Sequence, residues 1–108
     1  MIKYSILAIM LISLPLTVAA KGDPLSGKAK SAVCQACHGT DGKSVDPSYP
    51  NLAGQYASYI EIALKDYRSG RRTNAIMAGF SAALTDEDIA DLAAWYSSQQ
   101  GLEDLSIK

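Results

Sequence analysis

The apolar residues beyond position 24 recur at three- and four-residue steps, the spacing of helices that bury one face. From 25 to 36 this spacing predicts a first helix, with Ala29, Ala32 and Val33 in step. From 55 to 69 it predicts an amphipathic helix, followed by Gly70, where a helix would end. The residues that recur in this second helix are Tyr56, Tyr59, Ile60, Ala63, Leu64 and Tyr67. No stretch sustains the alternation of a β-strand.

A further helix is predicted from Thr85 to near Gly101. Thr85 can cap its start, and the acidic residues that follow suit the positive end of the helix dipole. Its predicted buried stripe consists of Ile89, Leu92, Ala93 and Tyr96, with Trp95 beside it. Two loops are predicted, over 39–50 and 71–84. Long loops in a small domain usually wrap something, so the pattern predicts an all-α domain around a bound group.

Residues 1–20 are typical of a secretory signal peptide. Lys3 gives a positive start, an apolar run follows from Ile6 to Leu14, and Val18-Ala19-Ala20 supplies small residues for cleavage. The competing interpretation is a permanent anchor, but the run is shorter than the roughly 20 residues of a spanning helix. We predict cleavage after Ala20, export to the periplasm and a mature domain over 21–108.

The mature domain is small and mildly acidic. The formal net charge of −1 becomes −2 once Lys3 leaves with the signal, which provides no basic patch for nucleic acid. A chain this short forms a marginal hydrophobic core by itself. A large apolar group bound inside it would supply much of that core, so we expect the protein without that group to be poorly folded.

The candidate chemistry lies in the segment Cys34-Gln35-Ala36-Cys37-His38, which has the C-x-x-C-H attachment signature of a c-type haem. The two thiols add to the two vinyl groups of the porphyrin and form thioethers. The adjacent imidazole then lies under the iron as an axial ligand. Two intervening residues place both sulfurs on one side of a helical turn, which is the geometry that this attachment requires.

The cysteine pair by itself is open to three other interpretations. A thioredoxin-like redox pair expects a βαβ pattern, which this chain lacks. A tetrahedral zinc site needs four ligands, whereas the mature chain has two cysteines and one histidine. A structural disulfide would not require His38, the only histidine of the chain. The haem interpretation explains all three residues.

Met77 is the candidate for the second axial ligand. Met1 and Met10 leave with the signal, so Met77 is the only methionine of the mature chain, within the second predicted loop. A thioether is a soft ligand that favours ferrous iron and raises the reduction potential. The alternative is that Met77 fills a gap in the core; the iron would then be open to gas binding or peroxidase-like chemistry.

With these residues the chain resembles the class I c-type cytochromes, in particular the small soluble bacterial type (c-553 or c4 haem domains). Besides C-x-x-C-H, the segment Pro50-Asn51-Leu52-Ala53-Gly54 matches the P-N-L-x-G pattern of that family. Tyr67-Arg68-Ser69-Gly70-Arg71 resembles its Y-R-x-G-x-R stretch, and the order continues through Met77 to a matching terminal helix. The resemblance implies a small cytochrome c fold, three to four helices wrapped around one covalent haem.

The family implies further roles. The carbonyl of Pro50 would accept the Nδ1 proton of the axial His38 and orient its ring. Gly27 would let the first helix cross closely over the last near Tyr96. Arg71 or Arg72 would hydrogen-bond a haem propionate, although ordinary solvated ion pairs are the alternative. Four aromatic residues would pack in the haem pocket: Tyr56, Tyr59, Tyr67 and Phe80.

The resemblance implies an electron carrier rather than an enzyme. One electron would enter and leave through the haem edge, with His38 and Met77 as iron ligands. Partners would be membrane or periplasmic reductases and oxidases, and the protein would be a monomer or weak dimer. Two alternatives stay open: a bound electron-transfer subunit of a larger oxidoreductase, and, without Met77 on the iron, a haem sensor or enzyme.

Overall fold

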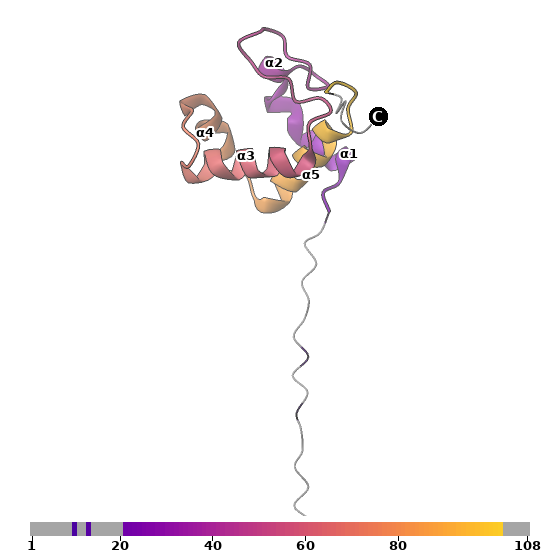
Figure 1. The fold of residues 1–108 in the computed structure, drawn as a ribbon, viewed down its shortest axis with the longest axis vertical. Coiled ribbons are helices and arrows are strands. Elements are labelled where there is room, and N and C mark those ends of the chain that lie inside the picture. Colours follow the sequence, from indigo (N-terminus) through magenta and orange to yellow (C-terminus); the bar gives the residue numbers. More distant parts are fainter. Residues whose placement is uncertain (1–9, 11–12, 14–20, 103–108) are drawn as a thin grey trace, which may run out of the picture.

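A computed structural model describes residues 21–102 and the isolated positions 10 and 13 (Figure 1). Apart from those two positions, the predicted signal peptide lies outside the described residues. All elements described there are helical, which confirms the all-α prediction. No helix in this part of the chain is long and apolar enough to cross a membrane.

The helix predicted over 25–36 is broken into three pieces. α1 (Pro24–Lys30) passes into a 3₁₀ turn, η1 (Ser31–Val33), and then into α2 (Gln35–His38). The prediction that Ala29, Ala32 and Val33 form the buried face of this helix was wrong, because all three are exposed. The buried residues of α1 and η1 are instead Gly27 and Ser31, since small residues allow the backbone to approach its neighbour closely. In α2 the buried residue is His38.

The second and last predicted helices are present as α3 (Ala57–Ser69) and α5 (Asp86–Ser97). α3 ends at Gly70, whose φ of 81° lies in the left-handed region that suits glycine. Thr85 caps α5 and forms a reciprocal capping box with Asp88. The predicted end of α3 and start of α5 are therefore confirmed, whereas α5 ends at Ser97, before the predicted end near Gly101.

The second predicted loop was wrong in part, because it contains α4 (Ala75–Ser81). Its start is capped by the Asn74 side chain, and Ser81 is the residue that it buries. α4 has only seven residues, which is too short for apolar periodicity to identify a helix. Counting 24–38 as one interrupted helix, the structure has four helical segments, within the predicted three to four.

The core forms where α3 and α1 meet α5 (Figure 1). It consists of Ile60, Leu92, Ala93 and Tyr96, with Leu64, Leu84 and Trp95 among the half-buried residues packed against it. α4 lies at the other end of α3 and packs on it. The predicted stripe of α5 is thus confirmed as buried.

The crossing of α1 over α5 depends on Gly27. A Cβ at this position would lie 1.9 Å from the carbonyl oxygen of Asp91 and 2.8 Å from Cβ of Trp95. The close approach expected of Gly27 is therefore present, although it falls on Asp91 and Trp95 rather than at Tyr96. This contact sets the distance between the two helices.

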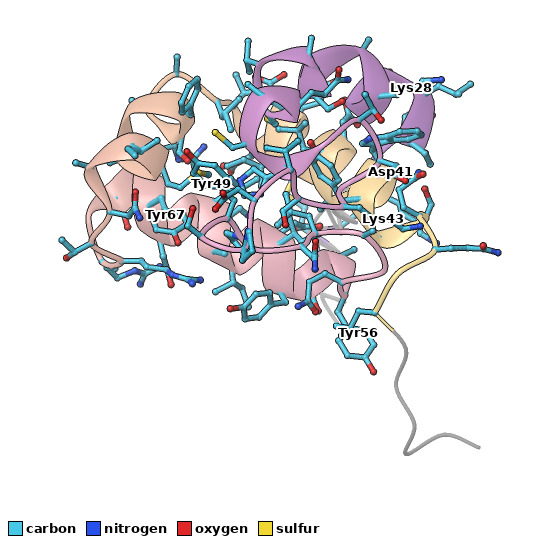
Figure 2. All side chains as sticks on the ribbon, turned by 90° about the horizontal axis from the view of Figure 1, so that it is seen from above. Lys28, Asp41, Lys43, Tyr49, Tyr56 and Tyr67 are labelled. Atoms are coloured by element: carbon cyan, nitrogen blue, oxygen red, sulfur yellow. The ribbon has the colours of Figure 1, made fainter. Side chains whose placement is uncertain are left out.

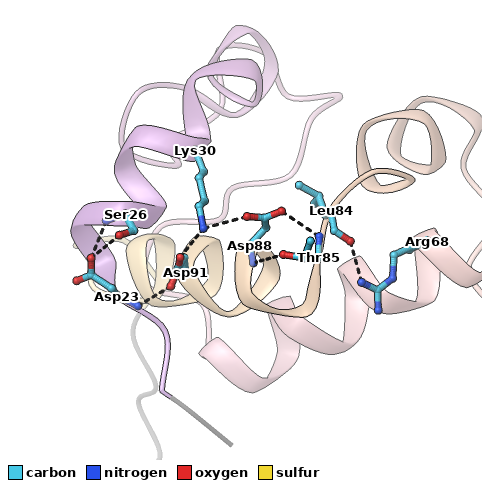
Figure 3. Close-up of polar contacts among 8 residues, drawn as sticks. All are labelled: Asp23, Ser26, Lys30, Arg68, Leu84, Thr85, Asp88 and Asp91. Atoms are coloured by element: carbon cyan, nitrogen blue, oxygen red, sulfur yellow. Dashed lines mark hydrogen bonds and ion pairs between the residues drawn. The ribbon is translucent and has the colours of Figure 1, made fainter.

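Charged groups fasten the same crossing (Figure 3). The nearly buried carboxylate of Asp91 accepts hydrogen bonds from the Asp23 N–H at 2.8 Å and from Lys30 Nζ at 2.6 Å. Lys30 also pairs with Asp88 at 2.9 Å. Hydrogen bonds from Thr85 and Lys30 lower the pKa of Asp88 to about 2, and Lys30 lowers that of Asp91. The network ties the start of the domain to its last helix.

A second fastening joins α3 to the connection between α4 and α5 (Figure 3). The Arg68 guanidinium donates to the carbonyl of Leu84 at 2.8 Å and to the carboxylate of Asp86 at 2.6 Å. Arg68 therefore holds the chain in place directly after α4.

We predict that Gly27→Ala destabilises the domain by roughly 1–3 kcal/mol or more, because its methyl group would overlap the α5 backbone. Guanidine unfolding of the purified protein measures this. Gly79→Ala is the matched control, since a Cβ there meets nothing within 4 Å and alanine favours the helix by up to about 1 kcal/mol. Equal midpoints for Gly27→Ala and the parent would contradict the close crossing.

We predict that Lys30→Met lowers the unfolding midpoint at pH 7, because Asp91 loses its counter-charge. The depressed carboxylate pKa values mean that this stabilisation is present above the ordinary value of 3.8 and disappears as the pH falls toward 2. The difference between variant and parent should therefore shrink over that interval in pH-dependent unfolding. Lys65→Met, which removes an exposed ion pair of 3.9 Å with Glu61, should change the unfolding midpoint little at either pH. An effect of Lys30→Met that does not depend on pH would refute the assignment to these carboxylates.

Candidate functional site

Both thiols of the C-x-x-C-H segment lie on one helical turn. The carbonyl of Cys34 accepts the His38 N–H at 3.0 Å and the Cys37 N–H at 3.3 Å, which closes the turn. Both cysteines are free and half-buried. The local structure thus brings two thiols and one imidazole to the same short helix, as the spacing predicts.

The imidazole of His38 is oriented by a distant backbone group. The side chain is buried, at 6% exposed, and its Nδ1 lies 2.9 Å from the carbonyl oxygen of Pro50. Because a carbonyl only accepts hydrogen bonds, Nδ1 carries the proton and the Nε2 lone pair is left for a metal. This is the contact that the family resemblance led us to expect.

Backbone hydrogen bonds hold the loop that carries Pro50. The carbonyl of Gly42 accepts from the N–H groups of Leu52 at 2.7 Å and Ala53 at 3.1 Å. The following residue, Gly54, donates to the carbonyl of Tyr96 at 3.0 Å at the end of α5. The segment 39–56 is thereby folded onto itself and onto the last helix, which places the Pro50 carbonyl within hydrogen-bond distance of the His38 Nδ1.

Met77 lies in α4 and not in a loop, and its side chain is half-buried. Its backbone N–H donates to Oδ1 of Asn74 at 3.0 Å. The sequence reasoning missed Asn74. The available signal was an asparagine before a run of helix-forming residues, which is the pattern of an N-cap.

Cys34 is half-buried and packs against the hydrophobic core. Burial raises the pKa of its thiol above the ordinary value. Burial also raises the pKa of the neighbouring Tyr96 phenol, and the Cys34 sulfur adds to that shift. Among the described residues, neither the Tyr96 hydroxyl nor the Ser81 hydroxyl has a hydrogen-bond partner, although both are buried.

The tyrosines expected around a bound group differ in placement (Figure 2). Tyr49, which was not among those expected, is half-buried, and the nearby Cys37 raises its pKa. Tyr67 lies between α3 and α4, whereas Tyr56 points outward. Tyr59 and Phe80 expose about half of their surface, 50% and 51%. The sequence reasoning did not single out Tyr49, which is the tyrosine beside the attachment turn.

The two arginines predicted to bind a propionate have other partners here. Arg71 is exposed and pairs with the Asp66 carboxylate at 2.9 Å. Arg72 stacks over the ring of Tyr67 at 4.9 Å and donates to the hydroxyl of Tyr59 at 3.3 Å. The structure thus gives the ordinary ion pair, which was the alternative for these positions, to Arg71.

The chemistry of the donor set fits a c-type haem. Two free thiols one turn apart match the two thioether bonds, and a buried imidazole with Nδ1 occupied matches a proximal ligand. The described residues contain no group of three or more His, Cys, Asp or Glu side chains placed to hold a metal ion. A protein-only zinc centre, weighed above, has no ligand set in this part of the chain.

Residues 20–100 match the family model described as cytochrome c. Cytochrome c-554(548) of Halomonas halodenitrificans is 51% identical over 82 residues, which are 73% of this chain and 99% of that protein. The crystal structure of reduced cytochrome c4 from Pseudomonas stutzeri matches with a TM-score of 0.71 at 41% identity. It covers 75% of this chain and 47% of that one, so the chain spans about half of this relative.

A third relative is the cytochrome subunit of sulfide dehydrogenase from Chlorobaculum tepidum. It is 36% identical over 72 residues, which are 67% of this chain and 64% of that protein. The similarity thus extends to a protein named as part of a larger enzyme.

Two fully buried serines provide a test of the unpartnered hydroxyl. Ser31 donates to the carbonyl of Lys28 at 2.7 Å, whereas Ser81 has no partner. We predict that Ser31→Ala lowers the free energy of unfolding by about 0.5–1.5 kcal/mol, while Ser81→Ala is neutral or stabilising because it removes a desolvated polar group. Chemical unfolding measures both; an equal loss at the two positions would show that Ser81 has a partner in the working protein.

Proposed function

Because the chain belongs to the cytochrome c family, as a small class I c-type cytochrome, we propose that it carries single electrons in the periplasm on one haem c with His38 and Met77 as axial ligands. Membership of the family makes the chain an electron-transfer haem protein. The covalent attachment, the ligand pair and the location are the proposal. The observation that carries it is the His38 imidazole, buried beside two free thiols with Nδ1 bound to Pro50.

Each residue has a separate task in this proposal. Cys34 and Cys37 bind the porphyrin through thioethers, and His38 presents Nε2 to the iron. The carbonyl of Pro50 holds the His38 ring in one orientation and makes its Nε2 a more basic ligand for the iron. Met77 supplies a soft thioether that favours the reduced iron. The haem, when bound, supplies the one-electron couple, and no residue of the chain is assigned a catalytic role.

The propionate contacts remain proposals for Arg71 and Arg72. A guanidinium suits a carboxylate, and both arginines are exposed next to the start of α4. Arg72 would have to leave Tyr59, a neutral partner, whereas Arg71 would have to leave the Asp66 carboxylate. Arg72 is therefore the better candidate of the two.

The position of the first packed residues supports cleavage after Ala20. A Cβ at Gly22 would lie 1.9 Å from the carbonyl oxygen of Ala90, and the Asp23 N–H binds Asp91. Gly22 and Asp23, within three residues of the proposed cut, are therefore already packed against α5. We propose that the mature protein works in the periplasm as the domain 21–108.

The proposed partners are redox proteins at the membrane or in the periplasm. In this proposal the protein diffuses to them as a free carrier, which is a monomer or weak dimer. The second candidate is a bound electron-transfer subunit of a larger oxidoreductase, supported by the similarity to the sulfide dehydrogenase cytochrome subunit. Purification of the tagged protein from its own periplasm distinguishes them. A free carrier elutes at the size of one or two domains, whereas a bound subunit elutes with a larger enzyme.

We predict that the periplasmically matured protein shows sharp bands of low-spin haem and the weak far-red band of a methionine–iron bond. Met77→Ala should lose the far-red band, bind carbon monoxide when reduced and have a lower reduction potential, since the soft ligand is gone. Absorption spectra and redox titration measure this. The control is Met77→His, which restores a sixth ligand without the thioether.

A parent protein that lacks the far-red band and binds carbon monoxide readily would overturn Met77 as the ligand and favour a haem sensor or enzyme. Haem lost from the denatured protein by acidified solvent extraction would contradict thioether attachment through Cys34 and Cys37.

A further inference from the structure

The helix that carries Met77 is fastened firmly at its end. Ser81, its last residue, is fully buried, and the Ala82 N–H continues the helical bonding to the Ala78 carbonyl at 3.0 Å. The chain just beyond is held by Arg68, which donates to the carbonyl of Leu84. The end of α4 is therefore fixed by burial and by a charged hydrogen bond.

The start of α4 has little of this support. Every residue from 71 to 76 is exposed, so the first turn buries no side chain before Met77. α4 has only seven residues, and a helix of that length is not stable on its own. The chain just before α4 is held to α3 by Arg72, whose N–H donates to the Asp66 carbonyl at 3.1 Å. The hydrogen bond to Met77 itself comes from the Asn74 cap, whose Oδ1 accepts the Met77 N–H at 3.0 Å.

We propose that Asn74 is a positioning residue of the iron site: its hydrogen bond to the Met77 N–H keeps the methionine sulfur from exchanging with outside ligands. This inference rests on the proposed function, in which Met77 binds the iron. Without the cap the first turn of α4 frays, and the Cα from which the methionine side chain extends is no longer fixed. The population with Met77 displaced then rises, and an outside ligand binds in proportion to that population.

The same chain contains a matched cap that touches no ligand. Thr85 Oγ1 accepts the Asp88 N–H at 3.1 Å at the start of α5, the equivalent bond to the third helical residue. α5 is twelve residues long and buries five of them, and Met77 is not part of it. Loss of the Thr85 cap therefore reports the general cost of losing such a bond.

The experiment titrates the matured ferric protein with imidazole and follows the far-red methionine–iron band. For Asn74→Ala we expect apparent imidazole affinity about fivefold higher than in the parent, the ratio that corresponds to a typical cap. Asn74→Ser, which keeps a strong capping side chain, should stay within about twofold of the parent. Thr85→Ala should lower the guanidine midpoint while its imidazole affinity stays at the parent value.

Unchanged imidazole affinity in Asn74→Ala, with the parent's far-red band present, would overturn the positioning role and leave Met77 ligation intact. An equal rise in Thr85→Ala would also overturn it, since general destabilisation would then explain the effect. A parent that lacks the band and binds imidazole as Met77→Ala does would overturn the proposed ligation itself, and the role of Asn74 with it.

Discussion

The close crossing of α1 over α5 is the constraint on which the remaining structure depends. Gly27 lets the two backbones meet, and the ion pairs of Lys30 with Asp88 and Asp91 hold them there. The attachment turn is joined to α1 by the short η1, so this crossing also decides where the two thiols and His38 stand relative to the core. The same α5 provides Tyr96, which closes the space beside Cys34 and receives the loop that carries Pro50.

The two proposed iron ligands are therefore held in different ways. His38 is buried in a turn packed on the core, and its ring is bound by a carbonyl from a loop with several backbone hydrogen bonds. Met77 lies on a seven-residue helix at the far end of α3, anchored after the ligand by Arg68 and before it by Asn74. Because the histidine is held firmly and the methionine by few contacts, an outside ligand would replace the methionine and not the histidine.

Much of the helical layout was predictable because its signals are local. Gly70 ends α3 through its own left-handed backbone conformation, and Thr85 starts α5 through its side-chain cap. The buried face of α5 is a stripe of apolar residues, which the spacing along the chain reveals. The first helix and the second loop were less predictable. Ala29, Ala32 and Val33 follow helical spacing but are exposed, and α4 buries Ser81 instead of an apolar stripe. Where small or polar residues make the contact, hydrophobic periodicity has nothing to detect.

The sequence by itself determined the chemistry that this protein can offer: two thiols and an imidazole at a spacing that fits one helical turn, and a single methionine after residue 20. Those features are local or are matters of composition, so no fold is needed to recognise them. Only the tertiary structure decided which groups surround them. The bond from His38 to Pro50 and the contact of Tyr96 with Cys34 join distant segments, and the helix around Met77 forms against α3. Such contacts depend on how the helices cross, which spacing along one chain does not specify.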